Sequence, residues 1–337
     1  MPILRRVTNE AGIGATAVGG PGARLLRGIG TMLGSALSNQ VGAALGAHAF
    51  GALGPAGVVA TRQVVAAAVL LPLARPPVRR MPRAQWWPVL LLAAVFGGMN
   101  LSLYTAIDRI GLGLAVTLEF LGPLAVALAG SRSRRDLSIA ATAAIGVYVL
   151  VLPGRSSDYL GLGLGLLAAG CWAAYIVLNR VAGARLPGLQ APALATALCA
   201  LAYLPVLLVL AGSGRLDGVP MAYAVAAGVL SSVVPYAADL TALRFVPQRF
   251  FGVFMSVHPV LAALVGMVLL GQLLAGHEWV GIAVVVLANA AAVTTAGGRP
   301  HEALAGPSSE GGVHVTVAEA LAGAELDVPV GRTSTGR

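Results

Sequence analysis

Hydrophobic positions fill ten long stretches of this chain, and short polar loops separate the stretches. Seven stretches contain no Asp, Glu, Lys or Arg: 84–107, 137–154, 161–179, 186–214, 218–238, 250–277 and 279–298. A bilayer core about 30 Å thick needs about 20 apolar residues for each crossing helix. Lipid offers no hydrogen-bond partners, so segments of this kind must satisfy their backbone internally, as helices do. The pattern predicts an all-α polytopic membrane protein.

The expected transmembrane helices follow the apolar stretches. Only Arg62 interrupts the second stretch and only Glu119 the fourth, while the turn 51–57 divides the charge-free run 28–61. We place ten helices near 28–49, 56–74, 86–107, 112–130, 137–153, 161–180, 191–212, 220–243, 250–271 and 279–297.

The arginines are distributed unevenly between the two sets of loops. With the N-terminus in the cytoplasm, eighteen arginines fall on the cytoplasmic side, and Arg109, Arg155 and Arg215 fall on the other. Basic residues are enriched in the cytoplasmic loops of membrane proteins. We therefore expect a multi-pass protein of the plasma membrane with both termini in the cytoplasm. The N-terminus lacks the compact apolar core of a cleaved signal peptide.

The two halves of the chain resemble each other. A shift of 136 positions brings Thr105 onto Thr241, Pro123 onto Pro259 and the pair 127–128 onto 263–264. Each half has five expected helices, and an odd number inserts the second copy with opposite orientation, as in many secondary transporters. We expect a cytoplasmic segment 1–27, five-helix repeats at 28–153 and 161–297, and a disordered cytoplasmic tail at 298–337.

Composition supports this class and excludes others. Hydrophobic residues form 57% of the chain and charged residues 10%, against about 25% charged in soluble domains. The net charge of +9 resides in loops without aromatic–basic patches, so we expect no nucleic-acid partner. Cys171 and Cys199 lie in apolar stretches without metal-ligand spacing, so we expect buried thiols, no metal and no cofactor. The oligomeric state is left open.

Two charged residues at membrane depth are the main candidates for function. Glu119 lies about eight residues into its helix, roughly 12 Å deep, and Arg62 enters its helix from the same side to roughly 9 Å. A charge at such depth costs at least about 2.5–3.5 kcal/mol and must face a cavity, pair or lose its charge. A contact between Arg62 and Glu119 is geometrically possible, and we expect the two residues to be coupled across the outer half of the cavity. Either a structural ion pair or a site for substrate charge and proton coupling fits the pattern.

Further polar and aromatic candidates lie at similar levels. Asn100 and Tyr104 share a helix face, because they are four residues apart, and Gln40 is on the first helix. Trp172 and Tyr175 either line the cavity or simply pack.

In the second half, Tyr236, Asp239 and His258 fall toward the cytoplasmic ends of their helices. An Asp239–His258 pair there would titrate near neutral pH. A structural histidine, with its hydrogen bonds satisfied, fits the same pattern.

Several motifs resemble the threonine/homoserine exporter branch of the EamA-type drug/metabolite transporter superfamily. They are Gly97-Gly-Met-Asn100, the string Leu118-Glu-Phe-Leu-Gly-Pro-Leu-Ala-Val-Ala-Leu128, Gly170-Cys-Trp-Ala-Ala-Tyr-Ile176, and Phe251-Gly-Val-Phe-Met-Ser256 with Pro259 and Gly271-Gln272. The similarity runs from about Gly34 to Thr295. In that family Gly271-Gln272 typically reads Gly-Glu, so this chain lacks an acid at 272.

The resemblance implies ten helices in two inverted five-helix repeats, both termini inside, and efflux of small metabolites. Together with the candidate residues it leads to a proton-coupled exporter of small neutral amino acids such as threonine or homoserine. Its partners would be the small-molecule substrate, protons and the lipid bilayer. One alternative is an exporter of another small metabolite or drug, and a scarcity of cavity aromatics disfavours drugs. Another is a passive channel, which would need rings of like charge. A membrane-embedded enzyme is disfavoured because catalytic motifs are absent.

Overall fold

The described part of the chain folds into a bundle of helices. The computed structural model describes residues 21–129, 133–152, 158–216, 218–235, 238 and 254–296, and within them it contains helices and no strand. In the first half the helices are α1 (Pro21–His48), α2 (Phe50–Ala74), the short 3₁₀ helix η1 (Val78–Arg80), α3 (Arg83–Ile110), α4 (Leu112–Glu119), α5 (Leu121–Leu128) and α6 (Arg134–Leu150). The later helices are α7 (Tyr159–Gly183), α8 (Gln190–Ala202), α9 (Leu204–Gly212), α10 (Val219–Gly228), the π-helix η2 (Val229–Val233), α13 (His258–Leu270) and α14 (Gly276–Ala296).

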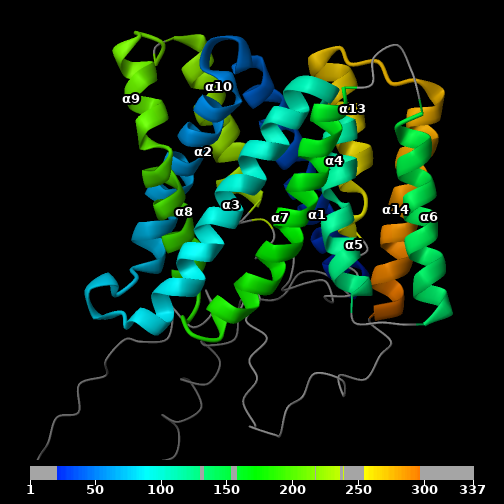
Figure 1. Ribbon diagram of the computed structural model, residues 1–337, viewed down its shortest axis with the longest axis horizontal. Coiled ribbons are helices and arrows are strands. Elements are labelled where there is room, and N and C mark those ends of the chain that lie inside the picture. Colours follow the sequence, from blue (N-terminus) through cyan, green and yellow to red (C-terminus); the bar gives the residue numbers. More distant parts are fainter. Residues whose placement is uncertain are drawn as a thin grey trace, which may run out of the picture.

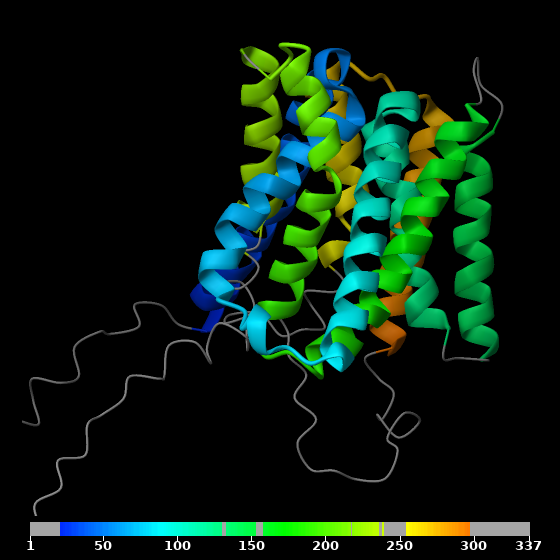
Figure 2. The same ribbon diagram turned by 60° about the vertical axis from the view of Figure 1, so that its left-hand side comes forward.

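Four of these helices are long and apolar enough to cross a membrane. They are α2, α3, α7 and α14, and α8 with α9 makes a fifth if that pair, bent by 40°, is one span. The helices stand side by side with their axes roughly parallel (Figures 1 and 2). Large apolar side chains such as Ile145, Val209 and Val268 face outward and are more than half exposed, which suits a lipid environment.

The structure differs from the sequence expectation at helix ends and breaks. The first helix starts at Pro21, earlier than expected. The segment expected as one helix near 112–130 is divided at Phe120, and the one near 191–212 is divided at Tyr203. In α2 the turn expected near 51–57 is a kink, because Gly54 has a φ of 68° ahead of Pro55. Parts of the segments expected near 220–243 and 250–271 lie outside the described residues.

The helix pairs that pack most closely define the frame of the bundle. Helix α3 lies along α7, α1 along α10 and α13, α2 along α8, and α4 along α13. Helices α6 and α14 pair with each other at one side of the bundle (Figure 1). One core cluster at the end where α1 meets α2 includes Phe50, Leu53, Val59, Leu112 and Ala262.

Close helix packing depends on glycine at particular positions. A Cβ on Gly122 of α5 would overlap the Ala169 carbonyl oxygen of α7. We expect Gly122→Ala to destabilise the protein by about 1–3 kcal/mol through overpacking. Gly163→Ala on the exposed face of α7, where a Cβ meets nothing within 4 Å, should be neutral or slightly stabilising because alanine favours helix. Thermal unfolding in detergent measures both variants, and equal midpoints would refute the steric argument.

Candidate functional site

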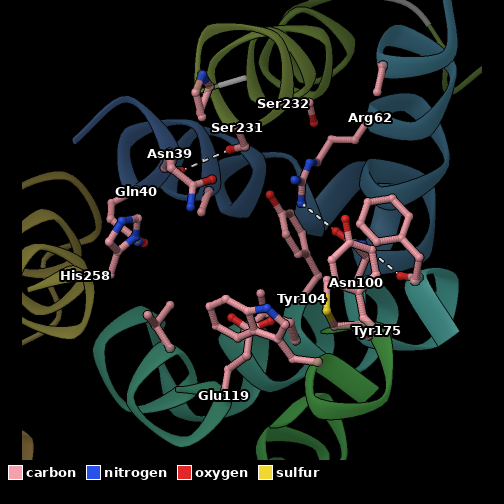
Figure 3. Close-up of a pocket in the computed structure, with 18 of the residues that line it drawn as sticks. Asn39, Gln40, Arg62, Asn100, Tyr104, Glu119, Tyr175, Ser231, Ser232 and His258 are labelled. Carbon is pink, nitrogen blue, oxygen red and sulfur yellow. Dashed lines mark hydrogen bonds between the residues drawn. The ribbon is translucent and has the colours of Figure 1, made fainter. Parts of the chain in front are cut away.

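A cavity of about 340 Å³ lies between the helices at the middle of the bundle (Figure 3). Its lining comes from α1, α2, α3, α4, α7, α8, η2 and α13. The lining includes eight of the ten residues singled out from the sequence: Gln40, Arg62, Asn100, Tyr104, Glu119, Trp172, Tyr175 and His258. The other two, Tyr236 and Asp239, lie outside the described residues. The described residues that were chosen for their depth in the expected helices therefore line one cavity.

Arg62 of α2 is 9% exposed and is held on two sides by α3. Its Nη1 donates a hydrogen bond to Oδ1 of Asn100 at 3.2 Å, and its Cζ lies 4.7 Å from the centre of the Tyr104 ring. Asn100 in turn donates from Nδ2 to the Phe96 carbonyl at 2.8 Å, which points its oxygen toward Arg62. The Arg62 Nε has no hydrogen-bond partner among the described residues. The guanidinium is thus fixed in place with donor capacity left over.

Glu119 is the last residue of α4, at the break before α5, and is 7% exposed. Glu119 and Arg62 do not form an ion pair, since the one ion pair among the described residues joins Arg109 to Asp158. Arg62 bonds to Asn100 instead, and in Figure 3 Arg62 and Glu119 reach the cavity from opposite sides. Similar depth places two residues at one level, but the direction in which each helix face points decides whether they touch. The Glu119 carboxylate has no hydrogen-bond partner in the described part of the chain, so it remains available to a ligand or a proton.

His258 opens α13 and is bonded to α1. Its Nδ1 lies 3.2 Å from Nε2 of Gln40, and its ring stacks on Phe120 with centroids 5.5 Å apart. When the Gln40 amide donates to Nδ1, the imidazole carries its hydrogen on Nε2. That Nε2 is buried and has no partner among the described residues. The expected pair with Asp239 stays a prediction, because position 239 is outside the described residues.

Aromatic side chains form one wall of the cavity. Trp172 meets Phe120 edge to face at 4.7 Å between centroids, and Tyr175 lies 5.6 Å from Phe96. Trp172 and Tyr175 therefore both line the cavity and pack against neighbours. With Tyr104 these residues make five aromatic side chains in the lining. The sequence argument that cavity aromatics are scarce is wrong.

Several small polar residues of the lining did not emerge from the sequence. Ser231 and Ser232 come from the π-helix η2, and Asn39 comes from α1. The Ser231 hydroxyl donates to the Asn39 carbonyl at 3.0 Å, while Ser38 donates to the Leu230 carbonyl at 2.8 Å. A π-turn is frequent at functional sites because it interrupts the regular hydrogen bonding of a helix. The two adjacent serines within the charge-free stretch 218–238 are the sequence signal that could have indicated this part of the lining.

Hydrogen bonds join neighbouring helices at the end of the bundle near the α1–α2 corner. Gln272, which follows α13, accepts a hydrogen bond at its Oε1 from the Leu112 backbone N–H, 2.9 Å away at the start of α4. Two glycines make room for its amide, since a Cβ on Gly111 or Gly266 would lie 3.0 or 2.8 Å from that oxygen. At the same end His48 lies with its Nε2 3.1 Å from the Leu269 carbonyl. Gln272, at the position where the family typically has Glu, thus joins the end of α13 to the start of α4.

The same end carries the ion pair of Arg109 and Asp158, with 2.9 Å between Nε and Oδ2. Asp158 also caps α7 by accepting from the Gly161 backbone N–H at 2.9 Å. The Gly161 N–H and the Arg109 guanidinium hold the pKa of the Asp158 carboxyl below its usual range. This pair neutralises the arginine of that loop.

No group of three or more His, Cys, Asp or Glu side chains in the described residues could hold a metal ion. Cys199 is buried and Cys171 is half-buried, and both are free thiols. The described residues of the cavity offer a ligand one arginine, one carboxyl group, unpartnered donors and an aromatic wall.

Comparison with known proteins assigns this architecture to a family. The model of the EamA-like transporter family matches residues 159–294. The chain is 34% identical over 246 residues to the threonine/homoserine exporter RhtA of Salmonella typhimurium strain LT2, which covers 72% of this chain and 83% of that protein. The RhtA protein of Escherichia coli K12 is 34% identical over 248 residues, with the same shares of each chain.

A crystal structure with 20% sequence identity superposes with a TM-score of 0.51 and covers 81% of this chain and 98% of the other, which shows a shared fold. The comparisons and the apolar helices together identify a multi-pass membrane protein that is a transporter and not an enzyme. The chain belongs to the EamA-like transporter family.

Proposed function

We propose that this transporter exports small neutral amino acids of the threonine and homoserine type, by alternating access coupled to protons. The observation that carries the proposal is the presence of a basic and an acidic side chain in the lining of one cavity. Among the described residues of its lining, Arg62 is the arginine and Glu119 the acidic residue, and they come from different helices. An amino-acid zwitterion also carries one charge of each sign. The named activity of the RhtA relatives agrees with this choice.

Each end of the zwitterion has a matching group. The Arg62 guanidinium, held by Asn100 and Tyr104, meets the substrate carboxylate, since arginine suits this group in geometry and charge. Glu119 meets the ammonium group, and it takes a proton when the cavity is empty, because a lone charge at this depth is costly. The unpartnered Nε2 of His258 and the Tyr104 hydroxyl remain for a side-chain hydroxyl.

The architecture we propose is ten transmembrane helices in two inverted repeats, at 28–153 and 161–297, with both termini in the cytoplasm. The packing supports a twofold exchange of the repeats. Under this exchange α1 corresponds to α7, α3 to α10 and α4 to α13. The contact of α1 with α10 then has its counterpart in the contact of α7 with α3. Likewise, the contact of α1 with α13 has its counterpart in the contact of α7 with α4. The arginine asymmetry of the loops supports the orientation. The cavity between the two halves is where such transporters bind substrate.

The aromatic wall favours a second candidate, an exporter of an aromatic or drug-like substrate. Phe96, Phe120, Trp172 and Tyr175 offer a larger apolar surface than threonine needs. A bulky apolar cation would use Glu119 and the aromatic wall and leave Arg62 without a partner. The two candidates therefore differ in their need for a carboxylate.

Transport in inverted membrane vesicles tests the proposal. We expect uptake of threonine and homoserine against their gradients when the vesicle interior is acidified, and loss of that uptake when an ionophore collapses the proton gradient. Phenylalanine and a quaternary ammonium dye serve as competitors in the same vesicles. Stronger competition by the dye than by homoserine would favour the second candidate, and accumulation unchanged by the ionophore would refute proton coupling.

A further inference from the structure

Six arginines gather on one rim of the bundle, where α2 ends, α3 begins and α7 ends. These three helices are among those long and apolar enough to cross a membrane, so their common ends lie at its surface. The group, which we name the basic rim, consists of Arg75, Arg79, Arg80, Arg83, Arg180 and Arg185. All six side chains are exposed.

The basic rim has no acidic partner in the segments that form it. The sequence contains no Asp or Glu between Glu10 and Asp108, and none between Asp158 and Asp217. None of the six arginines forms an ion pair with another described residue. At the opposite rim, by contrast, Arg109 is neutralised by Asp158. Within the described residues, the positive charge of the basic rim is therefore not compensated by an ion pair.

The segments of the basic rim are fixed relative to one another. Nε2 of Gln85 in α3 donates to the Arg185 carbonyl at 3.0 Å, which ties the α7–α8 connection to α3. The Arg185 guanidinium lies 4.9 Å from the centre of the Trp87 ring. Beneath them a core cluster containing Val89, Leu92 and Leu186 also receives Met81 from the α2–α3 connection. These contacts hold together the segments that carry the arginines, so the arginines lie on one surface and not on independent loops.

Trp86 and Trp87 stand in the first turn of α3, beside these arginines, and Trp87 is 45% exposed. Tryptophan favours the headgroup level of a membrane, and clusters of basic residues next to a membrane helix attract anionic headgroups. We propose that the basic rim binds the phosphate groups of anionic phospholipids. A single lipid phosphate would lie against Arg185 and Trp87, with the α2–α3 connection supplying the remaining charge.

Tryptophan quenching by brominated lipids in nanodiscs tests this inference. In the first variant, Trp172→Phe and Trp279→Phe leave Trp86 and Trp87 as the tryptophans of the protein. In the second variant, Trp279 is the one tryptophan that remains, and it lies at the opposite end of the bundle. Brominated phosphatidylglycerol should quench the first protein at least about threefold more effectively than brominated phosphatidylcholine, since each arginine near an anionic surface strengthens attachment about fivefold. The second protein should show no such preference. Salt at about 0.5 M should reduce the preference through screening.

Arginine variants locate the effect. Arg79→Gln/Arg80→Gln/Arg83→Gln should bring the preference for phosphatidylglycerol at Trp86 and Trp87 to about one, whereas Arg134→Gln/Arg135→Gln at the start of α6 should leave it unchanged. Equal quenching by the two lipids in the unaltered rim, or equal loss in both arginine variants, would overturn the proposal. Displacement of phosphatidylglycerol by inorganic phosphate would also overturn it and assign the site to a free anion.

Discussion

Replacing Glu119 with glutamine is expected to abolish uphill uptake into inverted vesicles, with a loss of at least about tenfold. The carboxylate is 7% exposed, lines the cavity and has no hydrogen-bond partner in the described part of the chain. A proton or an ammonium group is therefore what stabilises it at this depth. Glutamine keeps the size of the side chain and removes both options.

Two measurements separate the roles of Glu119. If it exchanges the coupling proton, Glu119→Gln should retain exchange of labelled for unlabelled substrate without a gradient while losing accumulation. If it only holds the ammonium group, exchange should fall together with accumulation. Glu278→Gln is the matched control, since Glu278 accepts from the Ala275 backbone N–H at the start of α14, away from the cavity. Full gradient-driven accumulation by Glu119→Gln would contradict both roles.

Arg62→Gln is expected to raise the KM for threonine by about 10–100-fold, since hydrogen bonds to charged groups contribute about 1.5–3 kcal/mol. Arg62→Lys should recover only part of the affinity. Lysine keeps the charge but loses the planar group that both bonds Asn100 and stacks on Tyr104. The measurement is concentration-dependent uptake by each variant.

A substrate analogue shows whether Arg62 recognises the carboxylate. The unaltered transporter should strongly prefer threonine over 1-aminopropan-2-ol, its decarboxylated counterpart, and Arg62→Gln should lose most of this preference. A variant that keeps the full preference would show that the carboxylate is bound elsewhere. In the double variant Arg62→Gln/Glu119→Gln the losses should be less than additive, because both groups act on one bound molecule.

Sequence alone could predict the helical class and most of the candidate site. Lipid-length apolar stretches leave few alternatives to helices, and a polar side chain at membrane depth must face the interior. That rule selected Gln40, Asn100 and His258 as well as the two charged residues, and all of these line the cavity. The shared family motifs pointed to the same transporter class.

Sequence could not predict which of these residues touch. Each successive residue turns a helix by about 100°, so an error of one or two residues at a helix end redirects a side chain entirely. For this reason the sequence placed Arg62 and Glu119 at one level but missed the Arg62–Asn100 bond, and the coupling of Arg62 with Glu119 stays a prediction. Ser231 escaped notice because a serine that bonds to backbone carries little insertion cost and leaves no mark in a hydropathy pattern. The roles of Tyr236 and Asp239 stay predictions.

Hydrogen bonds that join helices in this bundle are of two kinds. Several bonds of the frame, away from the cavity, pair a side chain with a backbone group: Ser38 with the Leu230 carbonyl, Tyr203 with the Gly97 carbonyl, and Gln272 with the Leu112 N–H. Two bonds in the cavity lining, Arg62–Asn100 and Gln40–His258, pair two side chains, although the Ser231–Asn39 bond of the same lining uses a backbone carbonyl. No substitution other than proline deletes a backbone partner, so half of each frame contact is protected from mutation. Over evolutionary time the cavity pairs can change together to suit new cargo, while the frame that holds them tolerates sequence drift and stays the same.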